Sequence, residues 1–157
     1  MRIYVISDTH NNTNNINIFA EKFTDGDAVI HLGDVIGDVH YLKKKIATPI
    51  YYVKGNCDYS NDSIEEIINI AGKKILLTHG HRYRVKESNQ LLLYRAREAE
   101  VDIALYGHSH CGDIDYSYGI FLINPGSLSL PRGSKVPTLA RIDINNGNID
   151  PLILNLF

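Results

Sequence analysis

The stretch RIYVISDTHNN, residues 2–12, decides how the fold begins. Its apolar run, residues 2–6, ends abruptly in polar residues that include Asp8 and His10. Apolar side chains then recur at the i, i+3, i+4 and i+7 positions between Ile16 and Phe23, which is typical of an amphipathic helix with one face on a core. The stretch therefore predicts a buried strand, a polar loop at its carboxyl end and a helix.

The next part of the chain repeats this order. Residues 27–31 form a second strand-like run, which stops before Gly33. A second helix follows, with Asp38 as its candidate N-cap because aspartate favours that position. Residues 50–54 form a third apolar run. Strands and helices thus alternate through the first part of the chain.

The remainder contains one more predicted helix, residues 88–100, and is otherwise rich in strands. We expect those strands at residues 64–70, 74–78, 102–106, 112–117, 120–124, 138–144 and 148–154. Strand–helix alternation followed by hairpins predicts two packed sheets flanked by helices. No linker or repeat interrupts the pattern, so we expect one domain over residues 1–157.

Composition limits the class of protein. The chain has 157 residues, 44% hydrophobic and 22% charged, which is ordinary for a globular protein. Its net charge of −2 provides no general attraction for nucleic acid. No apolar run approaches the roughly 18 residues that span a bilayer. We therefore expect a cytoplasmic protein without membrane contact, and its two cysteines, Cys57 and Cys111, predict no disulfide framework.

Side chains able to bind metal ions follow the predicted strands one after another. They are Asp8, His10, Asp34, Asn56, His79, His108 and His110. Loops at the carboxyl ends of strands form the binding crevice in sheets of this kind, so these donors should converge. Each donor stretch after the first carries a glycine, which permits the close backbone approach that a crowded site needs.

Carboxylate oxygen and imidazole nitrogen suit divalent ions such as Mn, Fe, Zn, Ni or Co. Seven donors are too many for one tetrahedral zinc and fit two adjacent ions that share a carboxylate. Two ions about 3.5–4 Å apart activate a hydroxide and stabilise the attacking and leaving oxygens of phosphoryl transfer. The donor set therefore predicts phosphoester hydrolysis.

The ordered series D-x-H, G-D, G-N-x-D, H-G-H and G-H-x-H resembles the calcineurin-like metallophosphoesterase family, and most closely its small YfcE-type phosphodiesterase branch. The resemblance runs from Asp8 to about Arg132. It implies an α/β fold, a four-layer α/β/β/α sandwich of two mixed sheets flanked by helices. It also implies two divalent ions per chain, with Mn favoured. The implied ligands are Asp8, His10 and His110 for one ion, Asn56, His79 and His108 for the other, and Asp34 as the bridge.

The sequence departs from the family at one position. Many members have histidine after the G-N pair, where it protonates the leaving group or contacts the phosphate, whereas this chain has Cys57. A thiol is a poorer proton donor near neutral pH, so we expect a diesterase in preference to a monoesterase. The proton donor is then absent, a metal-bound water, or His81. Asp58 is either a carboxylate that orients the site or a local turn cap.

Alternatives remain open at this point. A eukaryotic retromer subunit resembles the same fold and works through protein contacts, so a binding scaffold competes with the enzyme, as does a phosphomonoesterase. The expected partner is a small phosphodiester, with nucleic acid only as a possible substrate, and a homodimer or larger homo-oligomer is possible. Arg132 is a candidate phosphate ligand, while Arg82, Arg84 and Lys86 lie either on a phosphate-binding rim or in a solvated loop.

Overall fold

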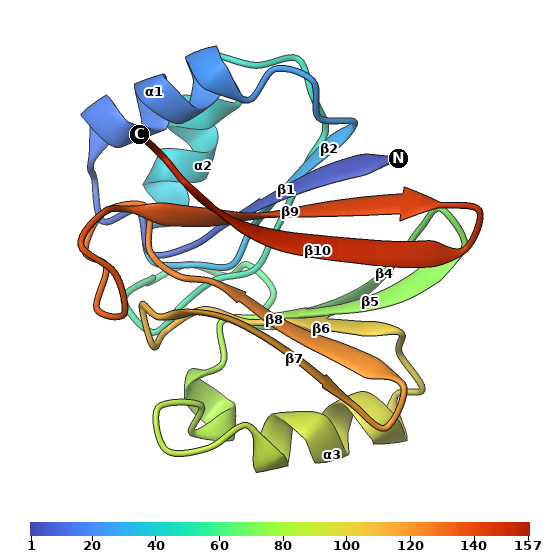
Figure 1. Cartoon of the computed structure of the whole chain (residues 1–157). Helices are drawn as coiled ribbons and strands as arrows, with labels where there is room; N and C mark the ends of the chain where they lie inside the picture. Colours follow the sequence, from blue (N-terminus) through green and yellow to red (C-terminus); the bar gives the residue numbers. More distant parts are fainter.

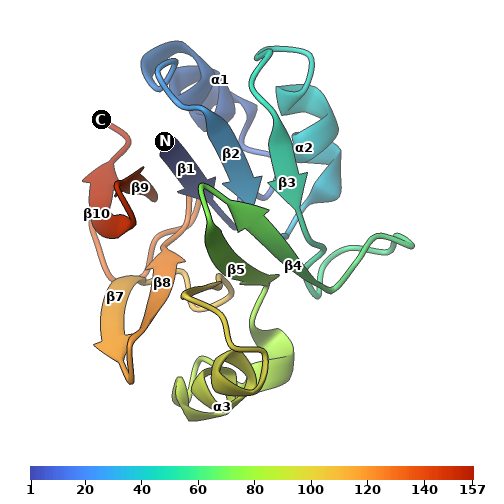
Figure 2. The ribbon, with the colours of Figure 1, turned by 90° about the vertical axis from the view of Figure 1, so that its right-hand side faces the viewer.

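The computed structural model, which describes residues 1–157, contains two five-stranded sheets packed face to face between layers of helix (Figure 1). Helices α1 (Thr13–Lys22) and α2 (Ile36–Leu42) cover the outer face of the first sheet, and α3 (Gln90–Glu98) covers the outer face of the second. Figure 2, turned by 90°, shows the same helices on opposite sides of the sheets. This is the four-layer α/β/β/α sandwich that the sequence resemblance implies.

Each sheet is mixed. The first has the order β10-β9-β1-β2-β3, with β1, β2 and β3 parallel and β9 antiparallel to both β1 and β10. The second has the order β4-β5-β6-β8-β7, with β5, β6 and β8 parallel and the two edge strands antiparallel. The strands are β1 (Arg2–Ile6), β2 (Ala28–His31), β3 (Ile50–Tyr52), β4 (Glu65–Ile70), β5 (Lys73–Thr78), β6 (Ile103–Leu105), β7 (Gly112–Ser117), β8 (Ile120–Pro125), β9 (Thr138–Asn145) and β10 (Asn148–Asn155).

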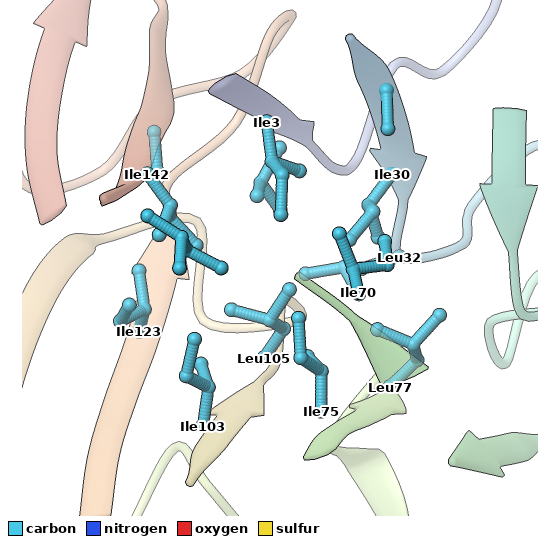
Figure 3. Close-up of a cluster of buried hydrophobic side chains, with 14 of the residues drawn as sticks. Ile3, Ile30, Leu32, Ile70, Ile75, Leu77, Ile103, Leu105, Ile123 and Ile142 are labelled. Carbon is cyan, nitrogen blue, oxygen red and sulfur yellow. The ribbon is translucent and has the colours of Figure 1, made fainter. Parts of the chain in front are cut away.

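The main core lies between the sheets. Side chains alternate across a strand, so Ile3 of β1 faces the second sheet while Tyr4 packs under α1. Figure 3 shows the inner faces meeting, with Ile3, Ile30 and Ile142 from the first sheet pointing toward Ile103 and Leu105 from the second. Each fully buried side chain of this size contributes about 1.5–3 kcal/mol before the entropy cost of folding. Because both faces of the central strands are covered, those strands are apolar almost throughout.

The helices differ from the sequence prediction in detail. Asp38 is not the N-cap of α2, because the helix begins earlier and Val35 occupies the cap position. The Asp38 carboxylate instead accepts a hydrogen bond from the backbone N–H of Asn11 at 2.8 Å, which ties α2 to the loop after β1. Helix α3 is shorter at both ends than expected. No helix in the structure is long and apolar enough to cross a membrane.

Candidate metal centre

The loops that follow β1, β2, β3, β5 and β6 converge, as the sequence predicts. The N–H of Asp8 donates to the carbonyl of Gly33 at 3.1 Å, joining the loops after β1 and β2. The N–H of Gly107 donates to the carbonyl of His79 at 3.1 Å, joining the loops after β6 and β5. The two sheets meet where the N–H of His108 donates to Asp8 Oδ2 at 3.1 Å.

Asp8 lies at the centre of the cluster and is completely buried. Its Oδ2 accepts hydrogen bonds from Ser7 Oγ at 2.6 Å and from the His108 N–H. Its Oδ1 makes no hydrogen bond of normal geometry. Three imidazole Nε2 atoms surround Oδ1: His110 at 3.1 Å, His10 at 3.9 Å and His79 at 4.0 Å. A buried carboxylate oxygen without a donor is unfavourable, so this atom is placed for a partner from outside the chain.

His79 and His110 are oriented in the same way. The Nδ1–H of His79 donates to the carbonyl of Leu32 at 2.8 Å, and that of His110 donates to the carbonyl of Leu130 at 2.7 Å. The Nε2 atom of each ring therefore faces a carboxylate, which for His79 is Asp34 Oδ2 at 3.4 Å. A lone pair facing an anion is repulsive, so a proton or a metal ion is needed between them.

His108 completes this side of the cluster. Its Nδ1 lies 3.2 Å from His79 Nε2, and the two rings are 5.1 Å apart. Burial lowers the pKa of His108 to about 4, and the charge of His79 acts in the same direction. His108 therefore offers an unprotonated nitrogen at neutral pH, which is the form that binds metal.

The two carboxyl groups remain ionised despite their burial. Burial raises the pKa of Asp34, but the contacts with His79 and the hydrogen bond from the Cys57 N–H together outweigh burial and hold the pKa well below the usual range. Burial is likewise outweighed at Asp8, whose pKa is lowered by His110. The same contact raises the pKa of His110. The cluster is thus an anionic pocket lined by basic nitrogens, which favours a cation.

The loop after β3 is more exposed. Both Asn56 and Cys57 are exposed, and the Asn56 amide nitrogen lies 3.6 Å from Cys57 Sγ. The Cys57 N–H donates to Asp34 Oδ1 at 2.9 Å. Partial burial and the neighbouring Asp34 raise the pKa of the Cys57 thiol to about 11, so the thiol is protonated at neutral pH.

Asp58 ties this loop to the loop after β2. Its Oδ2 accepts from the N–H groups of Asp34 at 3.0 Å and Gly55 at 2.8 Å, and its Oδ1 accepts from the N–H of Ile36 at 2.8 Å. The Gly55 bond is local, as a turn cap would be, whereas the other two bonds position the Asp34 backbone. The Asp58 carboxylate thus makes a local turn bond and also links the loops after β2 and β3.

His81 lies beside the cluster, in a short 3₁₀ helix (η1, His81–Tyr83) that the sequence analysis did not predict. Its ring is 5.5 Å from that of His79 and 6.1 Å from that of His108, and its buried Nδ1 has no hydrogen-bond partner. Burial lowers the pKa of His81, and the charges of His79 and Arg82 lower it further.

Five of the candidate ligands have left-handed backbone conformations. The φ angles are 55° at Asp8, 43° at His10, 48° at Asp34, 67° at His108 and 61° at His110. Such conformations cost roughly 1–2 kcal/mol for a residue with a side chain. They persist only where the surrounding structure enforces them, and they concentrate at functional sites.

Two glycines allow the loops to approach one another. A Cβ atom at Gly107 would lie 2.1 Å from Ser7 Oγ and 2.9 Å from Asp8 Oδ2. A Cβ atom at Gly55 would lie 2.0 Å from Asp34 Oδ1. The expectation that glycine permits close packing around the site is therefore confirmed at these two positions.

The donors present fit divalent metal ions. Ligand atoms lie within 4.8 Å of one another in three sets: Asp8, His10 and His110; Asp8, Asp34 and His79; and His10, Asp34 and Cys57. The unpaired Asp8 Oδ1 and His10 Nε2 belong to these sets. Mixed carboxylate and imidazole donors match borderline divalent ions. Asn56 directly precedes Cys57, a member of the third set.

Three residues that support the candidate ligands were not predicted individually from the sequence. Ser7 donates to Asp8 Oδ2, and Ser127 Oγ donates to the carbonyl of Asp8 at 2.9 Å. Thr9 Oγ1 lies 3.0 Å from His31 Nε2, so the buried His31 packs behind the ligand loops and is not a ligand. Their only signal in the sequence is proximity to the D-x-H motif or position in the turn at residues 124–127.

Comparison with known sequences gives related proteins over most of the chain. The probable metallophosphoesterase YsnB of Bacillus subtilis is 34% identical over 148 residues, covering 93% of this chain and 86% of that protein. The phosphodiesterase YfcE of Escherichia coli K12 is 26% identical over 109 residues, covering 63% of this chain and 55% of that protein.

Solved structures share the fold. A conserved Streptococcus pneumoniae protein classed as a predicted phosphoesterase superposes with a TM-score of 0.81 at 30% identity, covering 99% of this chain and 89% of that one. Entamoeba histolytica Vps29, solved with zinc, gives a TM-score of 0.75 at 21% identity and covers both chains fully, at 100% each. The sequence profile of the calcineurin-like phosphoesterase superfamily domain matches residues 1–147. Together with the five ordered loops described above, this match establishes that the chain belongs to the calcineurin-like phosphoesterase superfamily.

Proposed function

We propose that this protein is a phosphodiesterase that depends on two divalent metal ions. The observation that carries the proposal is the buried Asp8 Oδ1, which lacks a hydrogen bond while three imidazole nitrogens face it within 4.0 Å. A chain that needed this cluster only for stability would satisfy that oxygen with a donor. The family of the chain and the names of its relatives support a phosphoesterase.

The proposed ligands fall into two sets that share one residue. Asp8, His10 and His110 would hold one ion, Asn56, His79 and His108 would hold the other, and Asp34 would be the ligand shared by both. The contacts of Asp34 with His79 on one side and with the Cys57 N–H on the other support the bridging role. Manganese is the ion we favour, and Ni, Fe, Co and Zn suit the same donors. When bound, the pair of ions lowers the pKa of water for attack on phosphorus and offsets negative charge on the phosphate.

The chain's own residues orient these ligands. The carbonyls of Leu32 and Leu130 fix the rings of His79 and His110, so no ring rotation is required when substrate binds. Asp58 holds the backbone of Asp34 and of Gly55, and so places Cys57 and Asn56 beside the bridge. Sites held in place before reaction contribute to catalysis because they need no reorganisation in the transition state.

The cysteine at position 57 favours a phosphodiester substrate over a phosphomonoester. A thiol whose pKa is raised to about 11 transfers its proton poorly near neutral pH. A diester with a good leaving group needs less proton donation. His81 is the alternative proton carrier that we propose, and its ring lies 5.5 Å from that of His79. We further infer that residues 1–157 act as one domain, because the ligands come from both sheets and the sheets share one core.

The test compares bis-p-nitrophenyl phosphate with p-nitrophenyl phosphate. Metal-stripped protein is assayed alone and after restoring Mn, Ni, Co, Zn or Mg separately, with Asp34→Asn as the control of nearly equal shape. We expect metal-dependent cleavage of the diester, weak cleavage of the monoester, and at least about a 10²-fold loss in the Asp34→Asn variant. Faster cleavage of the monoester would favour a phosphomonoesterase. Bound metal without hydrolysis of either compound would favour a protein-binding scaffold.

A further inference from the structure

A cleft of about 590 Å³ opens beside the candidate metal centre. We call it the Lys86–Arg132 cleft; its lining includes Lys86, Asn89, Tyr106, Ser109, Asp113 and Arg132. It is formed by the loop before α3, the segment after β6 and the loop before β9. Its volume is in the range of small-molecule sites. None of the candidate metal ligands lines it, although Ser109 and Cys111 of its lining are sequence neighbours of His108 and His110, so the cleft adjoins the candidate metal centre.

The two cations of the cleft have no partner within the protein. Neither Lys86 Nζ nor the Arg132 guanidinium lies within 4.0 Å of a carboxylate, whereas the nearby Arg84 pairs with Glu87 at 2.8 Å. The cleft's one carboxylate, Asp113, instead lies 3.4 Å from the Tyr106 hydroxyl. The lining therefore carries an excess of positive charge that the protein itself does not neutralise.

The cleft is joined directly to the metal centre through the segment after β6. His108 and His110 face His79 and Asp8 of the candidate metal centre, while the intervening Ser109 lines the cleft. The backbone N–H of Arg132 donates to the carbonyl of His110 at 3.0 Å, which fixes the base of the arginine beside a proposed ligand. Lys86 is close enough for its charge to act on His108, behind the larger effects of burial and of His79.

We propose that the Lys86–Arg132 cleft binds a second phosphate group, carried on one arm of the diester substrate whose scissile phosphate lies at the metals. The proposal rests on the phosphodiesterase function. A guanidinium matches phosphate oxygens in a bidentate manner, and an ammonium adds a point charge. The substrate class is thus a phosphodiester with a further phosphate, such as a nucleotide derivative phosphorylated at both the 3′ and 5′ positions.

The hydrolysis test uses two chromogenic diesters that differ by one phosphate. They are thymidine 5′-(p-nitrophenyl phosphate) and the same compound with a 3′-phosphate. We expect kcat/KM of the metal-loaded protein to be about tenfold higher for the 3′-phosphorylated compound, and to observe a smaller ratio at high salt because ions screen the attraction. Arg132→Gln and Lys86→Gln should each reduce the ratio about three- to fivefold. Arg84→Gln, the matched control outside the cleft, should leave the ratio unchanged.

A binding measurement tests the phosphate site in the cleft independently of the proposed phosphodiesterase activity. Isothermal titration calorimetry of the metal-loaded protein compares thymidine 3′,5′-bisphosphate with thymidine 5′-phosphate. Tighter binding of the bisphosphate, lost in Arg132→Gln but kept in Arg84→Gln, supports the cleft even if no diester is hydrolysed. Hydrolysis of both diesters with equal kcat/KM, together with equal affinities for the two nucleotides, would overturn the inference and leave the phosphodiesterase proposal intact.

Discussion

Two regions of the candidate centre differ in how firmly the protein holds them. The inner group, Asp8, Asp34, His79 and His110, is buried, with no member more than 7% exposed. Hydrogen bonds from both sheets and from Leu32 and Leu130 fix its orientation. The outer group, Asn56, Cys57 and His81, consists of two exposed residues and one half-buried residue. These side chains adjoin the rest of the cluster, since Cys57 shares a set of ligand atoms within 4.8 Å with His10 and Asp34, and the His81 ring is 5.5 Å from that of His79.

The difference indicates which half of the site exists before a metal binds. The inner group is organised by the fold itself, at the cost of unfavourable backbone conformations and an unsatisfied oxygen. Metal binding can relieve part of that cost, so it should stabilise the folded state. In the outer group, Asn56 and Cys57 lie in the loop that Asp58 ties to the loop after β2. Changes to the inner group should therefore alter stability and activity together, whereas changes to the outer group should alter activity alone.

The largest expected effect comes from filling the gap behind Asp8. Gly107→Ala places a methyl group 2.1 Å from Ser7 Oγ and 2.9 Å from Asp8 Oδ2, where it forces both groups to move. We expect a loss of about 3 kcal/mol in the free energy of unfolding, measured by urea denaturation, and at least a 10²-fold loss of diester hydrolysis.

Gly37→Ala is the matched control for this substitution. Gly37 lies in α2, and a Cβ atom there meets only Val35 Cγ1 at 3.7 Å. Alanine in a helix should be neutral or stabilising by roughly 0.5 kcal/mol. Wild-type stability and activity in Gly107→Ala would mean that the inner group is not rigidly organised.

The second prediction concerns His31, which supports the inner group from behind. Its Nδ1 accepts the Gly33 N–H at 3.1 Å, its Nε2 contacts Thr9, and burial lowers its pKa to about 4. The unfolded pKa is about 6.5, so the unfolded chain binds the proton more readily and His31 contributes stability that is lost as pH falls. Between pH 7 and pH 5, the metal-free protein should lose about 2 kcal/mol of unfolding free energy through this residue.

His31→Gln isolates that contribution, because glutamine retains an acceptor and a donor but does not titrate. Denaturation of wild type and His31→Gln at several pH values gives the free energy of unfolding of each protein. The difference between the slopes of the two stability–pH curves is the contribution of His31. Parallel stability–pH curves for wild type and His31→Gln would show that His31 does not couple the ligand loops to folding.

The contrast between the inner and outer groups also explains which parts of the candidate site could be predicted from the sequence. Six of the seven expected ligands lie together because each follows a strand, and strand ends in a mixed sandwich converge by geometry alone. Asp8 and His10 could be located in this way, since the apolar run before them fixes where the strand stops. The outer group was harder to place, because a loop without regular structure does not determine how far a side chain such as Asn56 lies from its neighbours.

Local rules failed where long-range contacts decide the structure. Aspartate is a favoured N-cap residue, yet the Asp38 carboxylate accepts a hydrogen bond from the loop after β1. That bond joins two segments that are distant in the sequence, so no local pattern could predict it. The support from Ser127 is of the same kind, since it reaches Asp8 across more than a hundred residues of chain. The short η1 helix after His79 likewise depends on left-handed residues on either side, Gly80 and Arg84.

A third test weakens the link between the loop after β3, which carries Asn56 and Cys57, and the backbone of Asp34. In Asp58→Asn, the amide nitrogen replaces one of the oxygens that accept from Asp34, Gly55 and Ile36, so at least one backbone donor loses its partner. We expect about a tenfold decrease in activity or metal affinity, measured by metal titration and diester hydrolysis, with about 1 kcal/mol lost in stability. Asp62→Asn, in the same loop but bonded to the Tyr52 hydroxyl at 3.2 Å, is the control. Equal effects of the two changes would argue against a positioning role for Asp58.

The smallest expected effect is at Cys57, and it tests whether the outer group sets the choice between esters. Because the thiol is exposed and protonated at neutral pH, Cys57→Ala should reduce diester hydrolysis less than about fivefold. Cys57→His introduces an imidazole with a pKa near neutrality, so hydrolysis of the monoester should rise about tenfold relative to the diester. Steady-state kinetics on both p-nitrophenyl esters measure the ratio. If Cys57→Ala abolished activity while the metal content stayed the same, the thiol itself would take part in the reaction, and the outer group would be as essential as the inner one.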